Sequence, residues 1–169
     1  MGLINFIRTR VRRRRQIRRF SSYVDAKLVQ RILEDPEFES ALPSRQTIDF
    51  VLIVLNDDDL DGIPAILSRI LEMTRVHGGF VESLTGPLVF VEFGYPTPDA
   101  EAAAHRAAMV ASLGETLGDR VKILHGRGAA LVGTVAGKEG PFGAVIAGYH
   151  RLLKELTAME FGQVREVGV

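Results

Sequence analysis

The chain of 169 residues contains no cysteine, which excludes disulfide frameworks, thiol nucleophiles and thiolate metal sites. It also lacks long apolar runs: a run such as residues 51–55 is far shorter than the roughly 20 residues that a membrane-spanning helix needs. The first residues carry their charges after the apolar positions and are too few for a secretory signal core, so we expect no cleavable targeting segment. The length fits one domain, and 46% hydrophobic residues suffice for one core.

Acidic residues are absent from residues 1–19, although this segment contains eight arginines: Arg8, Arg10, Arg12, Arg13, Arg14, Arg15, Arg18 and Arg19. The remaining residues carry 13 basic and 21 acidic groups, so the net charge of 0 conceals a basic arm joined to an acidic domain. The arm resembles a surface-seeking amphipathic helix. We expect it to bind an anionic membrane surface, or the acidic domain of the same or another chain. Nucleic acid is the weakest candidate, because no aromatic interleaving supports it.

Hydrophobic periodicity divides the chain into the arm (1–19), a helix (20–36) and a domain (37–169). Within the domain, the pattern predicts a central strand at 48–55 that is buried on both faces. The elements predicted after it are a helix from Pro64 to Gly78, strands at 80–85 and 88–93 around a Gly86-Pro87 turn, a helix at 98–117, strands at 120–125 and 128–135, a helix at 144–159 and a strand at 163–169. This order contains β-α-β-β-α-β, which predicts an α+β, ferredoxin-like (split βαβ) fold with an antiparallel-rich sheet and helices on one face.

Two helices have apolar positions at helical spacing, which predicts the face that each turns to the sheet. In the first helix these positions are Ile66, Leu67, Ile70, Leu71 and Val76. In the alanine-rich helix, the residues on or beside one face are Ala102, His105, Ala108, Met109 and Leu113.

Four segments in chain order resemble the class III adenylate/guanylate cyclase homology domain. Residues 20–36 (FSSYVDAKLVQRILEDP) are similar to the helix that precedes many bacterial cyclase domains, and residues 77–94 (HGGFVESLTGPLVFVEFG) are similar to the family's hairpin. Residues 95–109 (YPTPDAEAAAHRAAM) resemble its Pro-Asp-His-Ala linker and alanine-rich helix, and residues 125–133 (HGRGAALVG) its Ile-His-x-Gly strand pair. The resemblance extends over nearly everything outside the arm and implies a cyclase homology domain.

The same resemblance implies a catalytic site from which the chemistry is missing. The family holds two divalent metal ions with two aspartates, and the matching positions here are Val54 and Pro87. The hairpin lysine that reads the base corresponds to Ser83, which has a short neutral hydroxyl. The segment between Val54 and Gly78 is also shorter than in the family pattern.

In the last predicted helix, the family uses an asparagine to orient the ribose and an arginine to stabilise phosphate charge. Alignment on Gly143 assigns these positions to Ala147 and Arg151. A shift of four residues instead gives the arginine position to Glu155, so the role of Arg151 stays open between a remnant of the site and a solvated helix residue.

Other constellations give weaker signals. Residues 57–62 match the opening of a calcium loop, but its twelfth position is Ser68 instead of a glutamate. The glycines of 126–137 are not followed by a phosphate-loop Lys-Ser/Thr pair, and no nucleophile-elbow motif is present. The four histidines have no paired ligand spacing and are not expected to bind metal: His77, His105, His125 and His150.

We therefore expect a catalytically inactive cyclase-like domain that needs no cofactor or metal. It is expected to form a homodimer, or a heterodimer with a cyclase-like domain or another signalling partner, in the cytoplasm or at the inner face of the membrane. The surfaces implied for pairing include Phe80, Ser83, Pro87, Val89 and Phe142. Two alternatives stay open: a nucleotide sensor or half-site partner that lends Arg151 to an active cyclase, and a dimerising handle for the basic arm.

Overall fold

The computed structural model describes residues 44–58, 60–96, 98–134 and 142–168. The predicted basic arm (1–19) and the predicted helix at 20–36 lie outside these residues. No helix of the described part has the length and apolar character that crossing a membrane requires.

A six-stranded sheet forms around β1 (Ser44–Leu55), which is buried from Ile48 to Ile53. The strand order is β2-β3-β1-β4-β5, with bounds of Phe80–Thr85 for β2, Leu88–Phe93 for β3, Val121–Thr134 for β4 and Phe142–Ile146 for β5. These neighbours all pair antiparallel, whereas β6 (Val164–Gly168) runs parallel to the first half of β4. The predicted central strand and antiparallel-rich α+β sheet are therefore confirmed.

The β2–β3 hairpin has the predicted bounds and turn. Thr85 pairs with Leu88, so only Gly86 and Pro87 form the connection. Gly86 has a φ of +57°, a left-handed conformation that glycine adopts without the steric cost that other residues incur.

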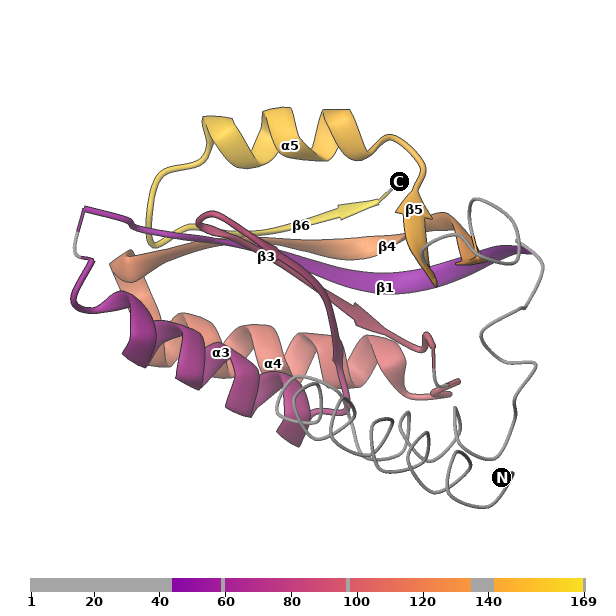
Figure 1. Cartoon of the computed structure of the whole chain (residues 1–169), viewed down its shortest axis with the longest axis horizontal. Coiled ribbons are helices and arrows are strands. Elements are labelled where there is room, and N and C mark those ends of the chain that lie inside the picture. The colour runs from indigo at the N-terminus through magenta and orange to yellow at the C-terminus, as the bar shows by residue number, and fades with distance from the viewer. Residues whose placement is uncertain (1–43, 59, 97, 135–141, 169) are drawn as a thin grey trace, which may run out of the picture.

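Helices cover both faces of the sheet (Figure 1). α3 (Ile63–Val76) and α4 (Ala102–Leu117) pack on one face, over a core that includes Val51 and Ile53 of β1. α5 (Tyr149–Ala158) packs on the other face, where its buried Leu152 and Leu156 contact a second core. The expectation of helices on one face holds for the β-α-β-β-α-β unit, whose helices are α3 and α4. α5 follows that unit and covers the other face, because strand β1 is apolar on both sides and each side needs a cover.

Two predicted element boundaries are also wrong. The expected strands at 120–125 and 128–135 are one continuous strand, because β1 pairs with β4 along its whole length, from Leu55↔Val121 to Ser44↔Val132. The expected helix at 144–159 starts only at Tyr149, since the residues before it form β5 against the end of β4.

The helix faces were predicted correctly in their main positions. Ile66 and Ile70 of α3 and Met109 and Leu113 of α4 are buried as expected. Some end positions differ: Val76 is 61% exposed, Ala108 is exposed, and α4 buries Arg106, which the apolar pattern did not include.

Candidate functional site

The two positions that the sequence resemblance assigns to metal-binding aspartates lie side by side in the sheet. Val54 pairs with Leu88 across the β1–β3 ladder, and the Leu55 backbone N–H donates a 2.9 Å hydrogen bond to the Pro87 carbonyl. The ends of β1 and β3 therefore bring together Val54 and Pro87, although 32 positions separate them in the sequence.

The residues at this junction do not fit a pair of divalent cations. Neither an isopropyl group nor a pyrrolidine ring provides an oxygen ligand, and hard cations require carboxylates or other oxygen donors. Val54, Leu88 and Tyr149 are half-buried and pack against the core under α5. Within the described part of the chain, no group of three or more His, Asp or Glu side chains is arranged to hold a metal ion.

The other positions implied by the resemblance lie on three different elements. Ser83 is half-buried on β2, opposite Phe90 of β3. Arg151 is exposed in the first turn of α5, whereas Ala147 lies in the turn before that helix. The expectation that Ala147 and Arg151 share the last helix is therefore wrong, because β5 extends to Ile146.

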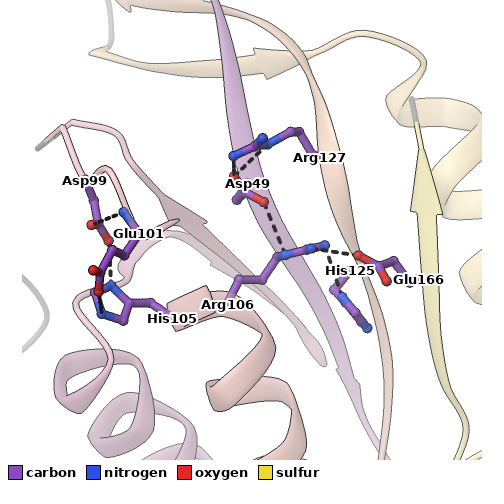
Figure 2. A network of polar contacts seen from close by, with 8 residues as sticks. All are labelled: Asp49, Asp99, Glu101, His105, Arg106, His125, Arg127 and Glu166. Atoms are coloured by element: carbon purple, nitrogen blue, oxygen red, sulfur yellow. Dashed lines mark hydrogen bonds and ion pairs between the residues drawn. The ribbon is translucent and has the colours of Figure 1, made fainter. Parts of the chain in front are cut away.

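A buried polar network lies on the opposite side of β1, under α4 (Figure 2). Arg106 of α4 is at its centre: its Nε lies 3.3 Å from Asp49 Oδ1, and its Nη2 donates a 2.7 Å hydrogen bond to Glu166. Arg127 of β4 approaches the other Asp49 oxygen, at 2.8 Å. Asp49 is 2% exposed, and the two guanidinium groups compensate its buried negative charge.

His125 completes this network in its neutral form. The Nη1 of Arg106 lies 3.1 Å from the His125 Nδ1. A guanidinium group only donates, so Nδ1 must accept, and the ring proton resides on Nε2. Burial and the neighbouring positive charge of Arg106 lower the pKa of His125, with Glu166 acting in the opposite direction.

The positive and negative charges of the network are equal in number, which indicates a structural role. Two arginines face two carboxylates, and the histidine is neutral. The hydrogen bond and the positive charge of Arg106 lower the pKa of Glu166, so that carboxylate is ionised at neutral pH. No charge remains to attract a ligand, and the network instead joins α4 to β1, β4 and β6.

This network was not predicted from the sequence, although one signal pointed to it. Asp49 is the only charged residue in the apolar run of the central strand, and a buried carboxylate requires partners. The partners themselves come from α4, β4 and β6, and nothing in the local sequence around Arg106 or Glu166 indicates that they converge.

The weaker candidates have local structural roles. His105 Nδ1 lies 2.7 Å from Asp99 Oδ2, and Asp99 also accepts a hydrogen bond from the Glu101 backbone, so this cluster supports the start of α4 (Figure 2). The acidic turn after β1 contains the exposed Asp57 and Asp58. Ser68, at the twelfth calcium-loop position, donates its hydroxyl to the Pro64 carbonyl.

The pairing surface implied by the resemblance is partly available. Phe80 and Ser83 are half-buried, and Pro87 is exposed at the hairpin turn. Leu84 beside them is an exposed hydrophobic residue, 48% accessible. Val89 is 1% exposed in the core under α3 and α4, so its assignment to a pairing surface is wrong.

No protein-family profile and no curated protein sequence matches the chain. Solved structures match its fold. The adenylyl cyclase CyaB from P. aeruginosa aligns with a TM-score of 0.62 and 13% identity, over 75% of this chain and 79% of that one. The guanylate cyclase domain of RhGC from Catenaria anguillulae, in complex with GTP, aligns with a TM-score of 0.57 and 9% identity, over 73% and 79%. A bacterial light-regulated adenylyl cyclase aligns with a TM-score of 0.59 and 12% identity, over 88% of this chain and 49% of that one.

The described domain thus has the fold of class III adenylyl and guanylyl cyclase domains, as the sequence resemblance implied. At identities this low, the likeness concerns the fold alone, and the chemistry depends on the residues at the site.

Proposed function

We propose that this domain retains the cyclase fold without the cyclase reaction, and that it acts by association with a second copy or with a cyclase-like partner. One observation carries the proposal: at the junction of β1 and β3, where the resemblance requires two metal-binding aspartates, the residues are Val54 and Pro87. A nucleoside triphosphate brings several negative charges, and side chains that cannot ligate a cation at this junction provide no compensation for them.

The neighbouring positions agree with this interpretation. Ser83 offers only a neutral hydroxyl where the resemblance implies a base-reading lysine. Val54 packs with Leu88 and Tyr149 against the apolar core that contains Phe90, and the Phe90 and Tyr149 rings lie 6.2 Å apart. Such surroundings favour packing over the binding of a triphosphate.

The β2–β3 hairpin is the part of the surface that we assign to association. Its tip exposes Leu84 and Pro87, while β2 forms an edge of the described sheet. Exposed apolar residues beside an unpaired strand edge are typical of contact surfaces between chains.

Sedimentation-velocity ultracentrifugation of the purified full chain tests this assignment. We expect a concentration-dependent dimer that Leu84→Glu weakens by about tenfold in Kd, which corresponds to the loss of roughly 1.4 kcal/mol of contact energy. Val76→Glu is the matched control, since Val76 is equally apolar and exposed but lies at the end of α3. A strictly monomeric protein that also fails to bind an active cyclase domain would contradict association as its role.

The alternative of a nucleotide sensor or half-site partner has one observation in its favour: Arg151 is exposed on the first turn of α5 and accessible to a ligand. Calorimetric titration with ATP and GTP in manganese separates the two functions. The main proposal predicts no saturable nucleotide binding, whereas binding that Arg151→Ala abolishes would support the alternative.

A further inference from the structure

A second pair of acidic residues lies away from the Val54–Pro87 junction, on strands β2 and β3. Glu92 pairs with Phe80 in the ladder and is two residues from Phe90, so it faces the same side of the sheet, the side covered by α5. The register between β2 and β3 shifts between Val81 and Ser83, which makes Glu82 the extra residue of a β-bulge. A bulge redirects side chains, and bulges are frequent beside functional sites.

Glu82 and Glu92 are neighbours on adjacent strands, because Glu82 is two residues from Phe80, the ladder partner of Glu92. Glu82 accepts a hydrogen bond from the Ala144 backbone N–H of β5, and its negative charge acts on Glu92. The hairpin therefore carries two neighbouring acids, one of which contacts β5.

Glu92 is the unusual member of this group. Its side chain is 0% exposed, and neither carboxyl oxygen has a hydrogen-bond partner in the described part of the chain. Buried polar atoms without partners are rare in folded proteins, because each costs about 1–3 kcal/mol. By contrast, the buried Asp49 is bound by two arginines.

The charges around Glu92 indicate what is missing. Burial and the charge of Glu82 raise the pKa of Glu92 to about 9, and burial together with both glutamates raises the pKa of Tyr95. Burial also raises the pKa of Glu82. No Lys, Arg or His of the described residues contributes to the shifts of Glu82 and Glu92, so these two carboxyl groups have no counter-cation there.

We propose that Glu82 and Glu92 form a binding site for a divalent cation of the oxygen-preferring class, such as Mg²⁺, Mn²⁺ or Ca²⁺. Carboxylates are ligands of the type that these ions accept. Access is from the edge of the sheet, because β2 is the outer strand and Glu82 is only half-buried. The site does not depend on the proposed function, since it shares no residue with the Val54–Pro87 junction.

Cation binding at this site has a proton signature. The cation replaces the proton that Glu92 otherwise holds at neutral pH, so binding releases a proton and strengthens as the pH rises. The groups that face Glu92 and share this titration are Glu82 and Tyr95.

Titration calorimetry of the full chain with manganese chloride at pH 8, in two buffers of different ionisation enthalpy, measures both affinity and proton release. We expect saturable binding of one Mn²⁺ with proton release, and a Kd that Glu92→Gln weakens by about tenfold or more. The amide is nearly isosteric with the protonated acid, and a thermal melt verifies that the variant folds.

Two controls make the result decisive. Glu72→Gln removes an exposed carboxylate of α3, whose Arg69 partner lies 2.9 Å away, and should leave Mn²⁺ binding unchanged. Asp58→Asn tests the exposed acidic turn and should also leave it unchanged. The proposal is overturned by the absence of saturable binding at millimolar Mn²⁺, by unchanged affinity in Glu92→Gln, or by loss of binding in Asp58→Asn alone.

Discussion

Arg106 is the residue whose environment departs most from the usual behaviour of its type. Its side chain is 8% exposed, yet its charge is matched by Asp49 and Glu166. Removal of one partner from a buried ion pair leaves the other charge desolvated, which costs more than the pair contributes while intact. The stability of the α4 side of the sheet should therefore depend strongly on this single side chain.

We predict that Arg106→Ala lowers the free energy of unfolding by about 3 kcal/mol, because Asp49 keeps only Arg127 and Glu166 loses its partner. Urea unfolding measured by circular dichroism provides the value. Glu72→Gln breaks the exposed ion pair with Arg69 and should cost less than about 0.5 kcal/mol. Equal losses in the two variants would contradict the central role of Arg106.

His125 predicts a pH dependence of stability. Its pKa is lowered in the folded state, whereas the unfolded chain binds the proton below about pH 6.5. Between the folded-state pKa and about pH 6.5, the unfolded state thus holds more protons than the folded state. The stability that neutral His125 contributes is therefore lost as the pH falls below about 6.5 toward the folded-state pKa. Protonation would also place a hydrogen on Nδ1, against the Arg106 guanidinium.

The measurement is the free energy of unfolding at pH 7.5 and pH 5.5 for the wild type and for His125→Gln. Glu92 acts in the opposite direction, since its raised pKa lowers stability as the pH rises from about 4.5 to about 9. The informative quantity is therefore the difference between the two proteins: the wild type should lose more stability on acidification than His125→Gln. Identical pH profiles would refute the neutral buried state of His125.

At the scale of elements, β6 is exposed at all but one of its residues, and its place depends on one glycine. A Cβ atom at Gly126 of β4 would overlap the carbonyl oxygen of Val167. The backbones of β4 and β6 approach closely at this point because Gly126 has no side chain.

We predict that Gly126→Ala displaces β6 and lowers the free energy of unfolding by about 1–3 kcal/mol. Hydrogen exchange should accelerate at the amides of Val164–Gly168 and remain slow in β1 and β3. Gly168→Ala is the control, since a Cβ atom at that residue would meet no described atom within 4 Å. Unchanged exchange of β6 in Gly126→Ala would show that the strand tolerates the displacement.

Local pattern predicted the elements well where one signal dominated. The β2–β3 hairpin was predicted with its bounds, because a Gly-Pro turn separates two apolar runs. The division of β4 was wrong, since its glycines look like a break while the long β1 holds the strand continuous. β5 was missed because its apolar residues fit a helix as well as a strand, and only pairing with β4 decides between them.

At the scale of the whole molecule, fold and chemistry have different sources in the sequence. Apolar periodicity and turn residues carry the cyclase-like fold, so the fold could be predicted without the catalytic residues. The adjacency of Val54 and Pro87 follows from strand order, and the sequence indicated it through resemblance alone. The Arg106 network and the Glu82–Glu92 pair depend on contacts between distant strands, which no local pattern reveals.

The basic arm gives the molecule a second property that deletion can test. Residues 1–19 carry eight arginines, each worth about 1 kcal/mol at an anionic leaflet. We predict that the chain sediments with phosphatidylserine-containing vesicles at low salt, and that deletion of 1–19 abolishes this binding without affecting dimerisation. A loss of the dimer in the deleted protein would assign the arm to contact between chains instead.

The measurement that tests the central claim most directly is the formation of cyclic nucleotide by the purified full chain. Incubation with ATP and with GTP in manganese, followed by mass spectrometry, should give no cyclic AMP or cyclic GMP above a protein-free blank, because Val54 and Pro87 provide no metal ligand. A cyclase activity that copurifies with the protein would contradict the account. It would also require metal ligands other than the residues at these two positions.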